Sequence, residues 1–272
     1  GAEVFTAACY HKDPNMMSYL EDPTKDMHAD MASACYKLPP SEVNKQTRHY
    51  AKNMFVFPQF YGDWFIDCAR SLWEAIGRMS LQTKSGTPLE QHLRSKGIME
   101  LGDLDPDHEP RSGTFEAHIK QVERHFWERR FPTYNRWKRR WHDGYKKRGY
   151  INTLTGFTCG GFMKRNEVIN YPVQGTAFHC LLWSMIRLVL HELPKYNERG
   201  KLNLATRVAG QIHDSLVCLV YEDDVPTFIR LARRVMCKLI KQHWPWLIAP
   251  MEIEAEVSPV GGCWADKKEI SI

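Results

Sequence analysis

VAGQIHDSLVCLV, from Val208 to Val220, contains two apolar runs on either side of a His-Asp pair. The runs are rich in β-branched residues, which predicts two half-buried strands that meet at a tight turn. The carboxylate of Asp214 would then lie between buried strands, where an ionised group loses hydration unless a cation or a hydrogen-bond donor compensates for the loss. We therefore expect a bound metal ion at Asp214, and capping of the turn is the alternative.

The composition is that of a folded, globular chain. Of its 272 residues, 43% are apolar and 12% are aromatic, which is enough to bury a core. The length fits one large domain or two small ones. The formal net charge is +5, from 37 Lys and Arg against 32 Asp and Glu. This excess permits a polyanionic partner without requiring one, so the distribution of the charges must decide.

Eight cysteines are scattered along the chain without a C-x-x-C pair, and no His cluster has the spacing of zinc ligands. This pattern is typical of small buried thiols in a reducing compartment. The sequence contains no signal peptide, and its most apolar run, Cys180 to Leu190, is interrupted by Arg187. We therefore expect a cytoplasmic protein without a membrane partner.

The chain begins Gly-Ala-Glu-Val-Phe, without an initiator Met, which predicts a processed protein or part of a longer one. Its first residues resemble the continuation of a strand, and a helical pattern follows Pro14. Asp26 precedes the next helical pattern. We expect Asp26 to cap that helix, with His28 in the first turn and an end near Pro39.

A cationic group of side chains and an aromatic group follow. Ser41–Asn44 resembles a helix cap, and Arg48 and Lys52 lie four residues apart, hence on one face of the predicted helix. Two cations at this spacing form a forked anion site suited to successive phosphates, and a solvated helix face is the alternative. Four rings come next, at Phe55, Phe57, Phe60 and Tyr61. Such rings can stack on a nucleobase, although we expect core packing to account for at least two of them.

Residues 63–149 are predicted to be mostly helical. A loop rich in Gly, Pro and Asp runs from Gly97 to Gly113, and residues 114–149 predict a long helix or a pair of helices. The latter segment contains the basic and aromatic runs Arg136–Trp141 and Lys146–Arg148. Basic residues interleaved with Trp and Tyr are typical of a surface that binds a nucleic-acid backbone, and a solvated helix face is the alternative.

The C-terminal half combines predicted hairpins with helices. Residues 149–163 alternate like a β-hairpin with a turn at Thr155-Gly156, and residues 166–175 are expected to form a loop before an apolar helix at 176–193. Asn170 and Gln174 stand four residues apart at the entrance of that helix. Their amides could donate to acceptors in a DNA minor groove or cap the helix. After Asp214, an amphipathic helix is predicted from 223 to 244 and a strand from 251 to 257.

Three separated motifs give the chain a resemblance to a known family. The first is Arg48-x-x-x-Lys52 with Phe57-x-x-x-Tyr61-Gly62, the second is NYPVQGTA at 170–177, and the third is QIHD at 211–214. In order and approximate spacing they resemble the motifs of family A DNA polymerases, the bacterial polymerase I-like class, in the version carried by bacteriophages. Shorter matches agree at 26–28, 126–132, 149–156 and 263–264, and residues 1–3 resemble the end of the family's D-x-S-x-x-E motif.

The resemblance implies an α+β fold in which a palm with a small antiparallel sheet accompanies a mainly helical fingers subdomain, with no thumb in this chain. The implied boundaries are 1–25 for the first part of the palm, 26–162 for the fingers with an insertion at about 89–113, and 163–272 for the rest of the palm. The metal-binding turn at 211–215 would belong to this last segment.

The resemblance also implies template-directed 5′–3′ nucleotidyl transfer by a two-metal mechanism, with primer-template DNA and dNTPs as substrates. Asp214 would be the metal ligand for two Mg²⁺ ions, and Arg48 and Lys52 would act with it in catalysis. The implied dNTP contacts are Glu3, His28, Arg48, Lys52, Phe57 and Tyr61, where Glu3 would exclude a ribose 2′-hydroxyl. The implied DNA contacts are Asn170, Gln174 and His213.

Two features depart from the family pattern. The family places its Phe four residues after the Lys, whereas Phe57 follows Lys52 by five, and one extra residue turns a helix by about 100°. We therefore predict a π-bulge, or a break, between Lys52 and Phe57. The second departure is Ser215, where bacterial members have Glu, so that the second carboxylate would be dispensable or replaced.

The family's other metal-binding Asp, in D-x-S-x-x-E, would precede Gly1. Because one carboxylate cannot hold two Mg²⁺ ions, we expect a second polypeptide that carries this Asp, the thumb and a 3′–5′ exonuclease. The alternatives are a single-subunit RNA polymerase of phage type, against which Glu3 and Phe57 argue, and a non-catalytic DNA-binding polymerase subunit. A metal-dependent phosphohydrolase is disfavoured because no other His or Asp is spaced to complete such a site.

Overall fold

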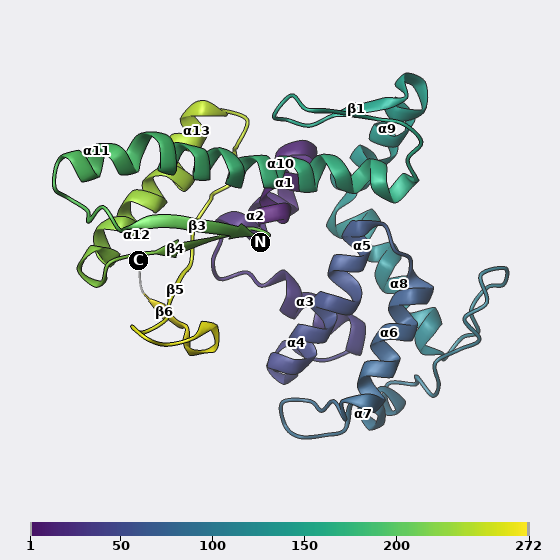
Figure 1. Ribbon diagram of the computed structural model, residues 1–272. Coiled ribbons are helices and arrows are strands. Elements are labelled where there is room, and N and C mark those ends of the chain that lie inside the picture. Colours follow the sequence, from purple (N-terminus) through teal and green to yellow (C-terminus); the bar gives the residue numbers. More distant parts are fainter. Residues whose placement is uncertain (1, 271–272) are drawn as a thin grey trace. The chain divides into compact units, whose positions relative to one another are not determined.

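The chain folds into helices and short antiparallel strands, which confirms the predicted α+β class (Figure 1). The structure, a computed structural model, describes residues 2–270. Within this range most residues are helical, and the strands form three separate two-stranded sheets.

The α-helices are α1 (Ala2–His11), α2 (Pro14–Glu21), α3 (Met27–Tyr36), α4 (Lys45–Ala51), α5 (Phe57–Tyr61), α6 (Phe65–Arg78), α7 (Leu89–Ser95), α8 (Phe115–His125), α9 (Pro132–Arg148), α10 (Arg165–Arg187), α11 (Leu193–Glu198), α12 (Val225–Arg233) and α13 (Ile240–His243). π-Helical segments extend some of them at η2 (Lys52–Val56), η3 (Phe126–Arg130), η4 (Leu188–Glu192) and η6 (Arg234–Leu239). Short 3-10 helices are η1 (Pro40–Glu42), η5 (Glu222–Asp224) and η7 (Trp264–Asp266). The paired strands are β1 (Tyr150–Asn152) with β2 (Thr158–Gly160), β3 (Arg207–Ile212) with β4 (Ser215–Leu219), and β5 (Ala255–Val257) with β6 (Lys268–Ile270).

The chain divides into two compact units. Within the described residues, unit 1 comprises 2–10, 150–160 and 171–270, and unit 2 comprises 11–149 and 161–170. The boundary between them therefore falls inside α10. The assignment of 1–25 and 163–272 to a palm and of 26–162 to fingers stays a prediction.

Unit 2 is a helical unit with an aromatic core. In it α3 packs on α4 and α6 packs on α8. The buried ring of Phe126 lies 5.5 Å from Phe55, 5.7 Å from Phe60 and 5.0 Å from Phe131, measured between ring centroids. Aromatic pairs at such separations contribute about 0.5–1.5 kcal/mol each beyond their area burial. Since Phe55 and Phe60 are both buried, the expectation that at least two of the four rings after Lys52 pack in the core is confirmed.

One buried carboxylate fixes the start of two helices in unit 2. Oδ1 of Asp13 accepts the backbone N–H of Asn15 at 3.0 Å and of Met16 at 3.3 Å, at the start of α2. Its Oδ2 accepts the backbone N–H of Thr133 at 2.9 Å and of Tyr134 at 3.0 Å, at the start of α9. These bonds satisfy N–H groups that a helix leaves unpaired, so Asp13 ties α2 to a helix far along the chain.

The helix that begins at Lys45 changes its winding after Lys52. Residues Lys52–Val56 form the π-helix η2, and the N–H of Phe57 bonds to the carbonyl of Lys52, five residues earlier. The predicted π-bulge between Lys52 and Phe57 is confirmed. The wider turn absorbs the extra residue, so Phe57 returns to the face of the helix that carries Lys52.

The expected loop at 166–175 is wrong, because α10 runs unbroken from Arg165 to Arg187 with Pro172 inside it. Proline lacks an N–H and leaves the carbonyl four residues earlier without its helical donor. The indole Nε1 of Trp141 donates to that carbonyl, on Val168, at 3.0 Å. The carbonyl of Pro172 itself accepts the hydroxyl of Tyr10 at 3.0 Å. Side chains distant in sequence therefore help the helix to continue through Pro172.

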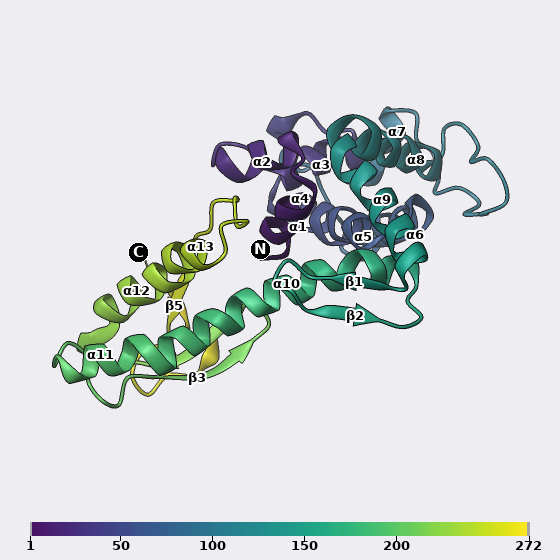
Figure 2. The same cartoon turned by 90° about the horizontal axis from the view of Figure 1, so that it is seen from above.

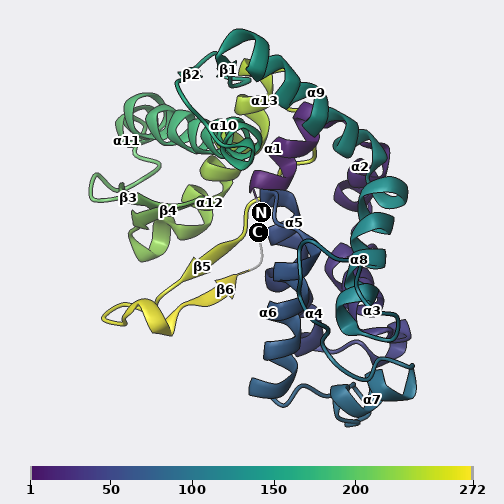
Figure 3. The same ribbon diagram turned by 90° about the vertical axis from the view of Figure 1, so that its right-hand side faces the viewer.

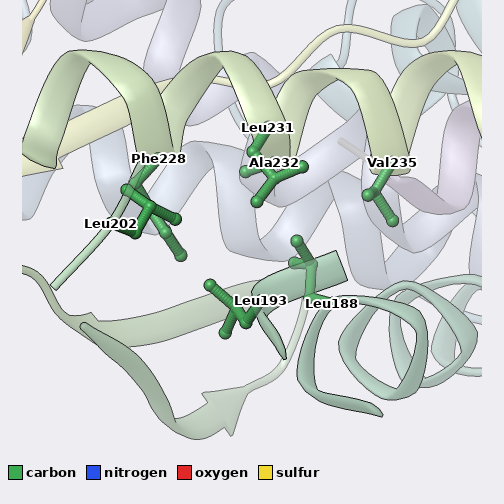
Figure 4. Packing of buried hydrophobic residues seen from close by; sticks show 7 residues of the cluster. All are labelled: Leu188, Leu193, Leu202, Phe228, Leu231, Ala232 and Val235. Carbon is green, nitrogen blue, oxygen red and sulfur yellow. The ribbon is translucent and has the colours of Figure 1, made fainter. Parts of the chain in front are cut away.

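Unit 1 has its own apolar core. The second half of α10 continues through η4 into α11 as one helical rod (Figure 2), and α12 packs along it. Figure 4 shows the side chains of this cluster converging from α12 and η6, from η4 and α11, and from the segment after α11 that carries Leu202. The buried members are Leu188, Leu193, Leu202, Phe228, Leu231, Ala232 and Val235. Full burial of such a side chain stabilises the fold by about 1.5–3 kcal/mol for the larger types.

The strands of unit 1 confirm the predicted hairpins with one change of length. β3 and β4 pair on either side of His213 and Asp214, with a register shift between Val208 and Gly210. β1 and β2 pair across the predicted turn at 155–156. The strand expected at 251–257 is limited to β5, Ala255–Val257, which pairs with β6 in a hairpin of its own (Figure 3).

The strand-like start expected for the first residues is wrong, because Ala2–His11 form α1. Ala2, Ala7 and Ala8 favour a helix, and the hydroxyl of Thr6 bonds back to the carbonyl of Ala2 at 2.9 Å. Val4 and Thr6 are the β-branched residues of this segment, and two are too few to outweigh this preference.

One helical segment of the described residues, Arg165–Glu198, is long and apolar enough to cross a membrane by length and composition. This segment extends well beyond the apolar run from Cys180 to Leu190 that Arg187 interrupts, because the π-helix η4 and α11 prolong the helix. The core helix of a soluble protein has the same length and composition. In this chain Leu188 and Leu193 of the segment are buried in the core of unit 1.

All eight cysteines are free thiols. Cys9, Cys35, Cys68 and Cys180 are buried, as expected for small apolar side chains, and burial raises the pKa of the Cys180 thiol to about 12.

Candidate functional site

Five of the six predicted dNTP-contacting residues lie in unit 2, where four of them are linked through contacts with aromatic rings. η2 places the ammonium of Lys52 over the ring of Phe57, 5.2 Å from its centroid. The same ring meets His28 edge to face at 5.9 Å between centroids, and the ring of Tyr61, one turn later in α5, lies 6.3 Å from it between centroids. We call His28, Lys52, Phe57 and Tyr61, together with Arg48 one turn earlier, the cation–aromatic surface.

The N-terminus of α3 supplies His28 to this surface. Asp26 caps α3 as predicted, since its Oδ1 accepts the N–H of His28 and of Ala29, each at 3.0 Å. The capped end holds the His28 ring edge to face against Phe57. The cap therefore fixes the position of a predicted dNTP contact.

Arg48 is paired with a carboxylate that was expected only to cap. Its Nε donates to Oδ2 of Asp26 at 2.6 Å. Partial burial raises the pKa of Asp26, but the hydrogen bonds from Arg48 and from the backbone of Ala29 outweigh it, so that its pKa is lowered. The pair links α3 to α4 across 22 residues of sequence, and no local pattern in the sequence could have indicated it.

His28 is uncharged at neutral pH in this structure. Burial, followed by the positive charges of Arg48 and Lys52, lowers its pKa to about 4. Its Nδ1 is buried and has no hydrogen-bond partner among residues 2–270. A phosphate oxygen next to this ring would supply an acceptor and a negative charge, both of which favour the protonated form.

The end of α5 carries two further residues of the matched motifs. Gly62 ends the helix with φ of 92°, a left-handed conformation that favours glycine, and a Cβ there would collide with the side chain of Asn166. Asn170, a predicted DNA contact, donates its amide to the carbonyl of Tyr61 at 2.9 Å. Within unit 2, Asn170 is therefore attached to the cation–aromatic surface through the backbone of Tyr61.

Unit 1 holds Asp214, His213, Gln174 and Glu3. His213 and Asp214 form the two-residue turn between β3 and β4, and His213 has φ of 50°. The side chain of Gln211 donates to the carbonyl of His213 at 3.3 Å. Asp214 is exposed, so the desolvation argument for a compensating cation at this carboxylate is wrong. Gln174 is exposed on α10, and Glu3 is half-buried in the first turn of α1.

A complete metal site is not formed by the part of the chain that the structure describes. No three His, Cys, Asp or Glu side chains in residues 2–270 cluster in a way that could hold an ion. The exposed carboxylate of Asp214 is a suitable oxygen ligand for Mg²⁺, but Mg²⁺ requires near-octahedral oxygen coordination and catalytic pairs of ions require more than one carboxylate. Asp214 alone therefore does not fit a two-metal centre.

Only some residues of the basic run on α9 are exposed to solvent. Arg136, Arg139 and Arg140 are exposed. Lys138 is buried, with its ammonium 2.9 Å from the centroid of the Trp127 ring, and burial lowers its pKa well below the ordinary value. The interpretation of the whole run as a nucleic-acid surface is wrong for Lys138 and for the buried Trp137, which belong to the core of unit 2.

Sequence comparison finds relatives that are named DNA polymerase I. The chain is 26% identical over 244 residues to the enzyme of Chloroflexus aurantiacus, a match that covers 86% of this chain and 20% of that protein. It is 28% identical over 166 residues to the thermostable DNA polymerase I of Thermus thermophilus, covering 57% of this chain and 18% of that protein. The corresponding values for Thermus aquaticus are 28% over 159 residues, 54% and 17%. The chain thus spans about a fifth of the length of these curated relatives, and no family model matches it.

A solved structure with a similar fold is the polymerase domain of Pol1 from M. smegmatis in complex with DNA primer-template and dNTP. The TM-score is 0.59 at 19% sequence identity, and the match covers 87% of this chain and 35% of that chain. At this identity the likeness concerns the fold alone. The fold and the named relatives together support the resemblance to family A DNA polymerases.

Proposed function

We propose that this chain is part of a DNA-directed DNA polymerase of the family A, bacteriophage type, and that it binds the incoming dNTP and the primer-template. The observation that carries the proposal is the cation–aromatic surface. It unites two cations, a histidine and two rings, which are the groups that a nucleoside triphosphate requires. The similarity to DNA polymerases I supports the same substrate class.

In this proposal Arg48, Lys52 and His28 neutralise the triphosphate, while Phe57 and Tyr61 pack on the sugar and the nascent base pair. Glu3 excludes the 2′-hydroxyl of a ribonucleotide. Asn170, Gln174 and His213 contact the primer-template. Residues 26–162 would then act as fingers and the remainder as palm, in a cytoplasmic enzyme.

Asp214 would contribute one ligand to a Mg²⁺ site. Bound Mg²⁺ ions would assist attack by the primer 3′-hydroxyl and departure of pyrophosphate. Because no three potential ligand side chains cluster among the described residues, we propose that further polypeptide, on the same chain or on a partner, completes the Mg²⁺ site with a second carboxylate. A thumb and a 3′–5′ exonuclease would belong to that same further polypeptide.

The first test is dNTP binding, measured by titrating the chain with dATP. Replacing both Arg48 and Lys52 by Ala should weaken binding at least about tenfold, since each charge-assisted contact contributes roughly 1.5–3 kcal/mol. Lys45→Ala, which removes an exposed charge at the start of the same helix, is the matched control. Equal dATP affinity in the double variant and the control would contradict the proposed dNTP site.

The second test is Mg²⁺-dependent primer extension by the chain together with the polypeptide that completes it. Asp214→Ala should abolish extension and leave DNA binding intact, whereas Asp223→Ala, at another exposed Asp of unit 1, should extend normally. Extension by Asp214→Ala would contradict the metal role. Preferential incorporation of ribonucleotides would favour the phage-type RNA polymerase instead.

A further inference from the structure

Asp26 uses its two carboxylate oxygens for two different purposes. Oδ1 accepts the N–H groups of His28 and Ala29 and caps α3. Oδ2 accepts Nε of Arg48 at 2.6 Å. A cap alone requires a single oxygen, so the second contact is not explained by the start of the helix.

The contact at Nε constrains the whole guanidinium group, because that group is planar and rigid. Among the described residues, none bonds to the two terminal nitrogens of Arg48, and its side chain is 43% exposed. Asp26 therefore engages the inner edge of the fork and leaves the outer edge accessible. Lys52 follows Arg48 by one helical turn, with its ammonium over Phe57.

We propose that Asp26 is a positioning residue for the dNTP: by holding Nε of Arg48, it orients the two terminal nitrogens toward successive phosphate oxygens. This inference rests on the proposed function, because it requires the triphosphate to bind at Arg48 and Lys52. An arginine that is already oriented loses less side-chain entropy when the ligand arrives, and this saving strengthens binding. The partly exposed pair is too weak to prevent small adjustments of the fork.

The substitution Asp26→Asn separates the two contacts. Asn is as good a cap as Asp, so its oxygen can keep the bonds to His28 and Ala29, while its NH₂ group would face Nε of Arg48 and cannot accept from it. We expect the dissociation constant for dATP to rise about 2- to 10-fold, which corresponds to ordering one long side chain, with an unchanged thermal unfolding midpoint. Asp22→Asn is the matched control, because Asp22 is a nearby Asp whose side chain contacts only residues of its own loop, Thr24 and Lys25.

A second background tests whether Asp26 acts through Arg48. Arg48→Lys keeps the positive charge but lacks the Nε donor and the fork. In this background, Asp26→Asn should change the dATP affinity much less than in the unaltered chain. The inference would be overturned if Asp26→Asn weakened dATP binding equally with Arg48 and with Lys at position 48, or if it caused no loss when Arg48 is present. Failure of the unaltered chain to bind dATP would instead overturn the proposed function, and the inference with it.

Discussion

His11 is a buried, uncharged histidine in unit 2. Its ring stacks on Tyr134 at 4.0 Å between centroids, and its Nδ1 accepts the N–H of Asp13 at 2.9 Å. Burial, reinforced by the charge of Lys138, lowers its pKa to about 3. In the unfolded chain the group takes up its proton near the ordinary value of 6.5. Between these values the unfolded state binds more protons, so stability is complete above pH 6.5 and falls as the pH drops toward 3.

We therefore expect His11 to contribute about 2–3 kcal/mol to the loss of stability between pH 7.5 and pH 4.5. His11→Asn keeps an acceptor for the N–H of Asp13 and does not titrate, so it should lower stability moderately at pH 7.5 and reduce the further loss at pH 4.5. Urea unfolding at the two pH values measures both effects. The control His125→Asn changes an exposed histidine and should lose as much stability between pH 7.5 and pH 4.5 as the unaltered chain. An equal loss in His11→Asn would contradict the role of His11 in the pH dependence. Burial also lowers the pKa of His28, so part of the loss of stability at pH 4.5 should persist in His11→Asn.

Single residues also mark the limit of what the sequence could predict. The cap at Asp26 was predictable, because capping depends on residues two or three positions away. The pairing of Asp26 with Arg48 was not, since it depends on how α3 and α4 pack. Lys138 was grouped with the exposed arginines of α9, but its exposure depends on the contact with Trp127. Exposure of Asp214 likewise depended on packing, although its place in a turn was predicted correctly.

At the scale of elements, η2 shows how a residue count can predict an irregular helix. Lys52 and Phe57 are five residues apart, and both contribute to one surface only if one turn is widened. α10 shows the opposite case. The helix through Pro172 could not be predicted from local rules, because the donor to the carbonyl of Val168 is Trp141, 27 residues earlier in the chain.

The π-helix predicts opposite outcomes for a deletion and an insertion. Deleting Asn53, a half-exposed residue of η2, should restore a regular helix in which Phe57 follows Lys52 by four positions, and should preserve dATP binding and thermal stability. Inserting one Ala after Asn53 should rotate Phe57 and Tyr61 by about 100° relative to Lys52 and weaken dATP binding strongly. Titration with dATP and circular dichroism of both variants provide the measurements. Comparable binding in the two variants would show that the alignment made by η2 has no role in the site.

At the scale of the whole molecule, the net charge of +5 is too small to identify a polyanionic partner, so the arrangement of charges must be tested. The exposed cations of α9 include Arg139, Arg140, Lys146 and Lys147, and none of these four has an ion pair within the described residues. A second set of four exposed cations lies on or near α6 and α7, at Arg70, Arg78, Lys84 and Lys96, of which Arg70 pairs with Asp67 and Arg78 with Glu74. The two sets allow total charge to be separated from position.

We predict that changing Arg139, Arg140, Lys146 and Lys147 to Gln weakens binding of primer-template DNA more than changing Arg70, Arg78, Lys84 and Lys96 to Gln, although both variants lose the same charge. Each phosphate contact that is lost should reduce the slope of log K against log salt concentration by about 0.9, because fewer counterions are released on binding. Fluorescence anisotropy with labelled primer-template at several salt concentrations gives both slopes. If affinity and slope decrease equally in the two variants, DNA binding depends only on the overall charge of the chain. The exposed cations of α9 would then form a solvated helix face and not a DNA contact.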